Sequence, residues 1–207
     1  TGMRTHLVQN KVYVEIGTSR DVTGWGEVSA LVPSAAEALA RRMFDLLDGE
    51  NPTRIEYLWQ KLFRAHRDMR GGPFMCHTIA GIDMALWDIT GKAAGLPVYM
   101  LLGGHVRDRV RVYRSIGGKN AAETAATAHQ LHEEFGFTAF KTSPFQVPPD
   151  EHRWGMVCKR AAEYFAELRK RCPEEWEFAF DPHAKIFEPV RALQLAHALA
   201  PYDPLFY

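Results

Sequence analysis

The sequence lacks the features that indicate a charged polymer or a membrane as a partner. Lys plus Arg and Asp plus Glu each number 25 among 207 residues, so the formal net charge is zero and nothing favours nucleic acid. No apolar run approaches the roughly 20 residues that a membrane helix needs, and residues 1–10 lack the apolar core of a signal peptide. We therefore expect a cytoplasmic protein that binds neither nucleic acid nor membrane.

Cysteine is scarce as well. Cys76, Cys158 and Cys172 are an odd number without a CxxC pair, which argues against a disulfide framework and against a zinc knuckle. Cys76 precedes His77, but adjacent residues on a helix point in different directions, so we interpret the three thiols as packing groups rather than nucleophiles. By contrast, hydrophobic residues make up 46% of the chain, which is ample for a sizeable core.

The first half of the chain has the pattern of a small α+β domain. Period-2 alternation predicts a hairpin from the extended segments 11–17 and 24–28. Helical patterns follow, beginning at Ser34, Asn51 and about Ile79. Ser34 and Glu37 have the spacing of a capping box, which predicts the start of the first helix. We assign residues 1–107 to this domain and expect a first strand of the sheet to lie before Thr1.

The second half alternates between strand and helix, which is typical of parallel βα units. The predicted strands are residues 109–116, 137–142, 177–181 and 204–207, and the predicted helices are residues 121–135, 152–171 and 188–200. We assign residues 108–207 to the opening of a (β/α) barrel of the TIM type. A closed barrel needs eight such units, so we expect an incomplete barrel of three to four strands.

The end of the third predicted strand carries the leading candidate site. Alternation places Phe178 and Phe180 on the face toward the helices, and Asp181 on the face toward the barrel interior. His183 joins Asp181 if the extended backbone continues. Functional groups of such barrels lie at the carboxyl ends of the strands. The alternative is that Asp181 caps a turn at Pro182 and His183 is an ordinary loop histidine.

Lys141 and Ser143 form a similar pair at the end of the second predicted strand. The lysine could polarise a carboxylate or, if desolvated, act as a base; the alternative is a surface lysine before the turn at Pro144. Lys185 continues the series of alternate residues after Asp181 and could contact a substrate carboxylate, and a solvated loop lysine is the alternative reading.

Residues 80–104 contain four short motifs at fixed spacing. They are Ala80-Gly-Ile-Asp-Met-Ala-Leu-Trp-Asp88, Gly91-Lys92, Gly95-Leu-Pro-Val98 and Leu101-Leu-Gly-Gly104. Together they resemble the linker segment of the mandelate racemase branch of the enolase superfamily. Gly24-Trp-Gly-Glu27 resembles the strand that follows the mobile cap loop of that family, and Phe137–Lys141 resembles the second barrel strand, which ends in Lys-x-Lys in racemases. The resemblance thus extends over nearly the whole chain.

Asp181-x-His183 resembles the third-strand motif of the galactonate dehydratase type within this superfamily. In that motif the Asp is the first Mg²⁺ ligand and the His is the general acid. Ser143 occupies the position of the second lysine of Lys-x-Lys, which weakens the alternative of a racemase, epimerase or cycloisomerase. A non-catalytic binding protein that keeps the cap and barrel shell is the other alternative.

The resemblance implies a Mg²⁺-dependent dehydratase of a small sugar acid of the galactonate or gluconate kind. Such an enzyme abstracts the α-proton, forms an ene-diolate and yields a 2-keto-3-deoxy acid. The implied roles are catalytic for Lys141 and His183, substrate-binding for Ser143 and Lys185, and metal-binding for Asp181. We expect the base and the other metal ligands to lie beyond Tyr207, so the 207-residue chain alone should be inactive. We also expect the intact protein to be a homo-oligomer.

Overall fold

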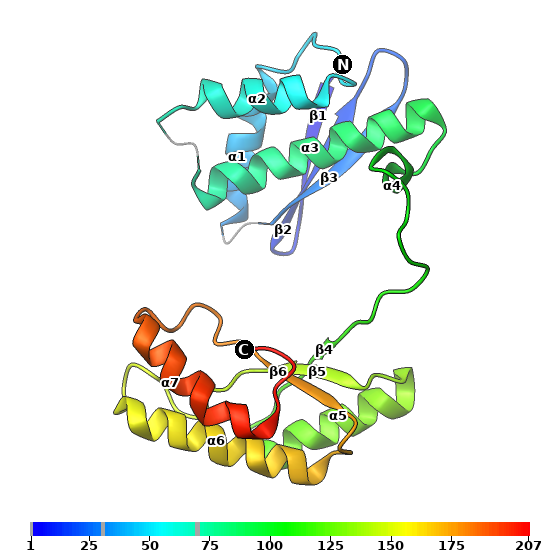
Figure 1. Cartoon of the computed structure of the whole chain (residues 1–207). Helices are drawn as coiled ribbons and strands as arrows, with labels where there is room; N and C mark the ends of the chain where they lie inside the picture. Colours follow the sequence, from blue (N-terminus) through cyan, green and yellow to red (C-terminus); the bar gives the residue numbers. More distant parts are fainter. Residues whose placement is uncertain (1, 30–31, 69–70) are drawn as a thin grey trace. The chain divides into compact units, whose positions relative to one another are not determined.

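Alternating apolar side chains build the antiparallel sheet of the N-terminal half. The computed structural model describes residues 2–29, 32–68 and 71–207. β1 (Gly2–Val8), β2 (Lys11–Gly17) and β3 (Thr23–Ser29) pair in the order β1-β2-β3 (Figure 1). The register places Val14 opposite Thr5 on one side and Gly26 on the other. Sequence analysis did not predict β1, because the polar residues of this strand obscure its alternation.

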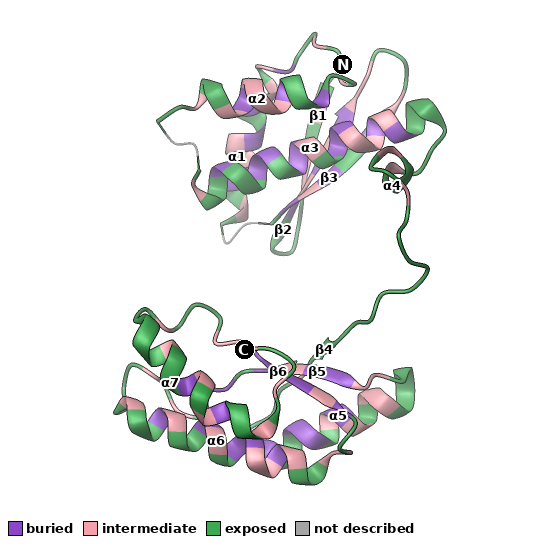
Figure 2. Ribbon diagram, in the orientation of Figure 1, coloured by how far each residue is buried: buried purple, intermediate pink, exposed green. Residues whose placement is uncertain are grey.

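Four helices follow the sheet in sequence. They are α1 (Pro33–Phe44), α2 (Ile55–Ala65), α3 (Pro73–Ala94) and α4 (Val98–Leu101). The shared core includes Val12, Val14, Met43, Leu58, Leu62, Ile82 and Ile89, all at most 2% exposed. Figure 2 shows this burial on α3 and on the strands that it covers. The helix expected to begin at about Ile79 begins earlier, at Pro73, and it ends at the left-handed Gly95.

The capping box predicted at Ser34 does not form. Pro33 is the first residue of α1, so Ser34 already lies inside the helix and its side chain makes no cap hydrogen bond. The Glu37 carboxylate instead accepts hydrogen bonds from the Thr5 hydroxyl at 2.7 Å and from the Arg41 guanidinium at 2.9 Å. Glu37 thus connects α1 to β1 rather than to its own N-terminus.

The long motif of residues 80–104 owes its spacing to the packing of α3 on β3. A Cβ atom added to Gly26 would overlap the carbonyl oxygen of Gly81, so the two backbones are in direct contact. The Asp88 carboxylate accepts the Trp25 N–H at 2.9 Å, and Lys92 donates to the same carboxylate at 2.7 Å. The glycines and charged residues of this motif therefore hold a helix against a strand.

The C-terminal half contains a parallel sheet with three helices. β4 (Arg114–Ser115), β5 (Ala139–Thr142) and β6 (Glu177–Phe180) pair in the order β4-β5-β6. The helices are α5 (Ala121–Phe135), α6 (Trp154–Arg171) and α7 (Pro189–Leu199), followed by the short η1 (Ala200–Tyr202). The chain forms two compact units, Thr1–Asp108 and Arg109–Tyr207, hereafter the N-terminal and C-terminal units.

Two predicted strands differ from the structure. The strand expected over 109–116 is reduced to β4, because Arg114 already pairs with Phe140 near the start of β5 and residues 109–112 lie beyond the reach of that strand. Residues 204–207 are not assigned as a strand. They do lie alongside β6, since the Leu205 N–H donates to the Phe178 carbonyl at 2.7 Å.

Aromatic side chains fill the space between the parallel sheet and its helices. The Phe165 ring of α6 lies edge-on to Phe180, with ring centroids 4.3 Å apart, and it also contacts Phe178. Phe140 of β5 stacks with Phe178. All four rings are fully buried. The predicted sorting of Phe178 and Phe180 toward the helices is confirmed, so the opposite face of each strand is left for polar side chains.

Candidate functional site

The carboxyl ends of β5 and β6 bring two charged side chains together. Lys141 is opposite Ala179 in the parallel register, two residues before Asp181. The Lys141 ammonium donates to the Asp181 carboxylate at 2.8 Å, and both side chains are about three-quarters buried, with 24% and 30% exposed. Residues 40 positions apart in sequence thus meet at the edge where a parallel sheet places its functional groups.

The ion pair fixes the charge of both partners. The hydrogen bond from Lys141, followed by those from the His183 backbone and side chain, lowers the pKa of Asp181 to about 2. The hydrogen bond to Asp181 raises the pKa of Lys141 above its ordinary value. The two therefore remain an ammonium and a carboxylate around neutral pH, which favours the electrostatic role predicted for Lys141 over the role of a base.

His183 reaches Asp181 through a turn and not through a continued strand. β6 ends at Phe180, and His183 and Ala184 both adopt left-handed backbone angles, with φ of 50° and 57°. The His183 N–H donates to Asp181 Oδ1 at 2.8 Å, and Nδ1 lies 3.3 Å from Oδ2. The expected extension was wrong, yet the predicted neighbours are brought together. The imidazole is 85% exposed, so it is open to a ligand.

Ser143 and Lys185 lie apart from this cluster of Lys141, Asp181 and His183. The Ser143 hydroxyl accepts the Phe145 N–H at 3.2 Å, which closes a turn at the end of β5. The Lys185 N–H donates to the Pro182 carbonyl, and its ammonium lies 5.9 Å from the centroid of the Phe145 ring. Both residues are exposed on the loops that follow β5 and β6.

Among the three residues of the cluster, Asp181 alone offers a carboxylate. Mg²⁺ prefers six oxygen ligands in octahedral geometry, and Asp181 offers one carboxylate of the right chemical type. Within residues 2–29, 32–68 and 71–207, no three His, Cys, Asp or Glu side chains are grouped so that they could hold a metal ion. The described residues alone therefore do not complete a Mg²⁺ site.

A buried polar chain behind β5 escaped the sequence analysis. The Tyr164 hydroxyl of α6 donates to the Thr124 hydroxyl of α5 at 2.9 Å and lies 3.5 Å from the Thr142 hydroxyl. Thr142 in turn accepts the Asp181 N–H at its carbonyl, at 3.1 Å. These hydroxyls connect two helices to the strand end that carries the cluster. Only their contacts in the structure identify these three hydroxyl groups, because the residues belong to no recognisable sequence motif.

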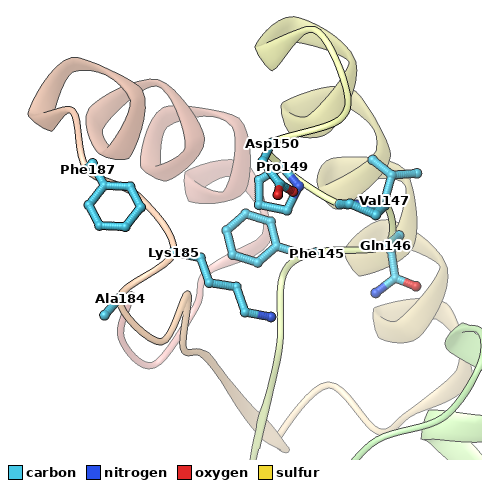
Figure 3. A pocket seen from close by; sticks show the side chains of 9 residues that line it. Phe145, Gln146, Val147, Pro149, Asp150, Ala184, Lys185 and Phe187 are labelled. Atoms are coloured by element: carbon cyan, nitrogen blue, oxygen red, sulfur yellow. The ribbon is translucent and has the colours of Figure 1, made fainter.

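The loops after β5 and β6 line an open cavity of about 560 Å³ (Figure 3). Its walls include Phe145, Pro149 and Phe187, and its polar groups are Gln146, Asp150 and Lys185. Sequence analysis identified only Lys185 among them. The sequence did offer one indication of this cavity, the long, proline-containing connection between β5 and α6. Long loops in compact domains are commonly functional.

In the part of the chain that the structure describes, no helix is long and apolar enough to cross a membrane.

Residues 1–103 match the family model for the N-terminal domain of mandelate racemase / muconate lactonizing enzyme. The curated relatives include a D-galactonate dehydratase from Pectobacterium atrosepticum, 38% identical over 201 residues, and one from Ralstonia nicotianae, 40% identical over 198 residues. Each alignment covers 94% of this chain and 50% of the relative, so the chain spans about half the length of these relatives.

Solved structures extend the similarity to the whole chain. An enolase from Agrobacterium radiobacter, a candidate galactarate dehydratase bound to sodium and L-malate, matches 100% of this chain and 53% of its own with a TM-score of 0.92 and 43% identity. An enolase from Pantoea ananatis with bound D-gluconate and magnesium matches 99% of this chain and 58% of its own with a TM-score of 0.84 and 27% identity. The predicted fold class, an α+β capping domain followed by the opening βα units of a barrel, is confirmed.

Proposed function

Because the chain belongs to the mandelate racemase / muconate lactonizing enzyme family of the enolase superfamily, we propose that the full-length protein dehydrates a sugar acid. The observation that carries this proposal is the cluster of Lys141, Asp181 and His183 at the ends of neighbouring parallel strands. The D-galactonate dehydratases at 38% and 40% identity support the reaction class.

His183 is the proposed general acid. Its Nδ1 lies 3.3 Å from the Asp181 carboxylate, which orients the ring, and the mostly exposed imidazole presents Nε2 to a substrate hydroxyl. In the reaction a base removes the α-proton and the C3–O bond breaks. The hydroxyl takes the proton of His183 and departs as water, and the resulting enol tautomerises to the 2-keto-3-deoxy acid. We assign the base to no residue of this chain.

Asp181 is the proposed protein ligand for Mg²⁺, with further oxygen ligands needed from other residues of the full-length protein. When bound, the cation would stabilise the negative charge that develops on the substrate carboxylate as the α-proton leaves. Lys141 keeps Asp181 ionised and in place through its 2.8 Å hydrogen bond. As an ammonium, Lys141 can also interact with the substrate carboxylate, which is the second part of its proposed role.

Ser143 counts against a racemase, epimerase or cycloisomerase. Its hydroxyl accepts the Phe145 N–H in a turn, and a hydroxyl does not replace a lysine base. We therefore give Ser143 a role in shaping the loop beside the substrate. A protein that only binds a sugar acid would keep the cavity without needing the Asp181–His183 contact.

The proposed activity is tested by incubating the full-length protein with Mg²⁺ and a panel of sugar acids, and by measuring 2-keto-3-deoxy acid. Asp181→Asn should lose activity, and excess Mg²⁺ should restore part of it, since the variant removes a metal ligand. Asp45→Asn, which changes an exposed carboxylate paired with Arg42 on the N-terminal unit, is the matched control and should match the wild type. Epimerised acid without keto product, or no turnover of any acid, would overturn the dehydratase assignment.

A further inference from the structure

The cavity after β5 and β6 has the chemistry of a polyhydroxy-acid pocket. Phe145, Pro149 and Phe187 provide an apolar wall, and three side chains bring hydrogen-bonding groups: Gln146, Asp150 and Lys185 (Figure 3). A carboxylate accepts hydrogen bonds from hydroxyls, an amide both donates and accepts, and an ammonium only donates. A few convergent polar groups in an apolar pocket are the usual means of fixing a small ligand.

Lys185 is a free cation in this pocket. Among the described residues its ammonium forms no salt bridge, and it lies 5.9 Å from the centroid of the Phe145 ring. Figure 3 shows Lys185 extending past Phe145, with its ammonium and Asp150 on opposite sides of that ring. Asp150 therefore does not neutralise it. An unpaired ammonium beside an apolar wall favours an anionic ligand group.

The backbone presents this cation at a defined place. Lys185 follows His183 and Ala184, whose consecutive left-handed conformations turn the chain, and its N–H is hydrogen-bonded to the Pro182 carbonyl at 3.2 Å. Neither Asp181 nor His183 lines the cavity, whereas Ala184 and Lys185 do. A ligand group that contacts Lys185 in the cavity therefore lies apart from one that contacts Asp181 and His183.

We propose that this pocket binds the second carboxylate of a dicarboxylic sugar acid, with Lys185 as its counter-ion and Gln146 and Asp150 on the neighbouring hydroxyls. This inference rests on the proposed dehydratase function and narrows its substrate class from aldonates, which end in an uncharged CH₂OH group, to aldarates. Lys185 is thus a specificity-determining residue, and the reacting carboxylate is recognised elsewhere.

The experiment compares galactarate with galactonate, which differ only in the oxidation state of the terminal carbon, on the full-length protein. Wild type should favour galactarate in kcat/KM. Lys185→Met, which keeps the apolar stem and removes the charge, should reduce the galactarate-to-galactonate preference about tenfold, as expected for loss of one charged hydrogen bond. Most of the change should lie in KM for galactarate. Lys185→Arg should restore the preference, and Lys170→Met, at an exposed lysine on α6, should leave it unchanged.

Calorimetric titration with the two acids in the presence of EDTA separates this proposal from the proposed function. If wild type converts neither acid but Lys185→Met still weakens galactarate binding selectively, the pocket stands and the dehydratase assignment falls. If Lys185→Met lowers kcat/KM for both acids equally, or changes neither the preference nor the binding of galactarate, the second-carboxylate pocket is wrong whatever the activity.

Discussion

Charged side chains have different roles in the two units. In the N-terminal unit, Asp88 and Lys92 belong to a long motif, and both bind the backbone or each other where α3 packs on β3. In the C-terminal unit, Lys141 and Asp181 bind each other at the open ends of strands, and the exposed His183 ring joins them. A long, regularly spaced motif can thus specify packing, whereas a three-residue motif at a strand end carries the proposed chemistry.

The largest expected effect on stability is in the aromatic core of the C-terminal unit. Phe165→Ala removes a fully buried ring that contacts Phe178 and Phe180, and should lower the free energy of unfolding of this unit by about 3–5 kcal/mol. Chemical denaturation followed by circular dichroism measures it. Phe187→Ala, at a ring that is 87% exposed, should change stability by less than about 0.5 kcal/mol. Equal losses would contradict this account of the core.

The corresponding weak point of the N-terminal unit is a glycine contact. Gly26→Ala places a methyl group against the Gly81 carbonyl and should lower the stability of this unit by about 3 kcal/mol, near the upper end of overpacking effects, because neither backbone can yield easily. Gly155→Ala, at a helical glycine with no atom within 4 Å of the added Cβ, should be neutral or stabilise by up to about 1 kcal/mol. A wild-type melting transition for Gly26→Ala would show that α3 and β3 are not in close contact.

The smallest expected effect on stability concerns two helix N-termini, one with a side-chain cap and one without. The Asn120 side chain accepts the Glu123 N–H at 3.0 Å at the start of α5, so Asn120→Ala should lower the free energy of unfolding by about 1 kcal/mol. Ser34→Ala should be nearly neutral, since Ser34 makes no cap hydrogen bond in α1. The denaturant midpoints of the two variants give both changes in stability. A larger loss of stability for Ser34→Ala than for Asn120→Ala would show that Ser34 does cap α1.

Much of the fold was predictable because its elements repeat a simple period. Alternation located β2 and β3, and helical spacing located α3 and α5. The misses have local physical causes. β1 is an edge strand with a weak pattern, and Pro33 starts α1 one residue before the expected cap. A strand needs a neighbouring strand to pair with, and residues 109–112 have no such partner in the described sheet.

The candidate site was predictable only in part. Sequence analysis placed Lys141 and Asp181 at the ends of two predicted strands, and the structure brings their side chains to 2.8 Å. It could not predict the left-handed turn at His183, because an imidazole residue with positive φ is uncommon and depends on its surroundings. The Thr142–Tyr164 contact and the cavity around Phe145 come from the folding of separate loops and helices, so no local sequence pattern reveals them.

The central claim, that the strand-end cluster performs dehydration, is tested most directly by His183→Asn in the full-length protein. Formation of 2-keto-3-deoxy acid should fall by about 10²–10⁴-fold, the usual contribution of a general acid, and excess Mg²⁺ should not restore it. In deuterated solvent the variant should still exchange the substrate's α-proton, because another residue removes it. His197→Asn, at an exposed histidine of α7, is the control. Dehydration by His183→Asn at the wild-type rate would contradict the claim and leave His183 a structural loop residue.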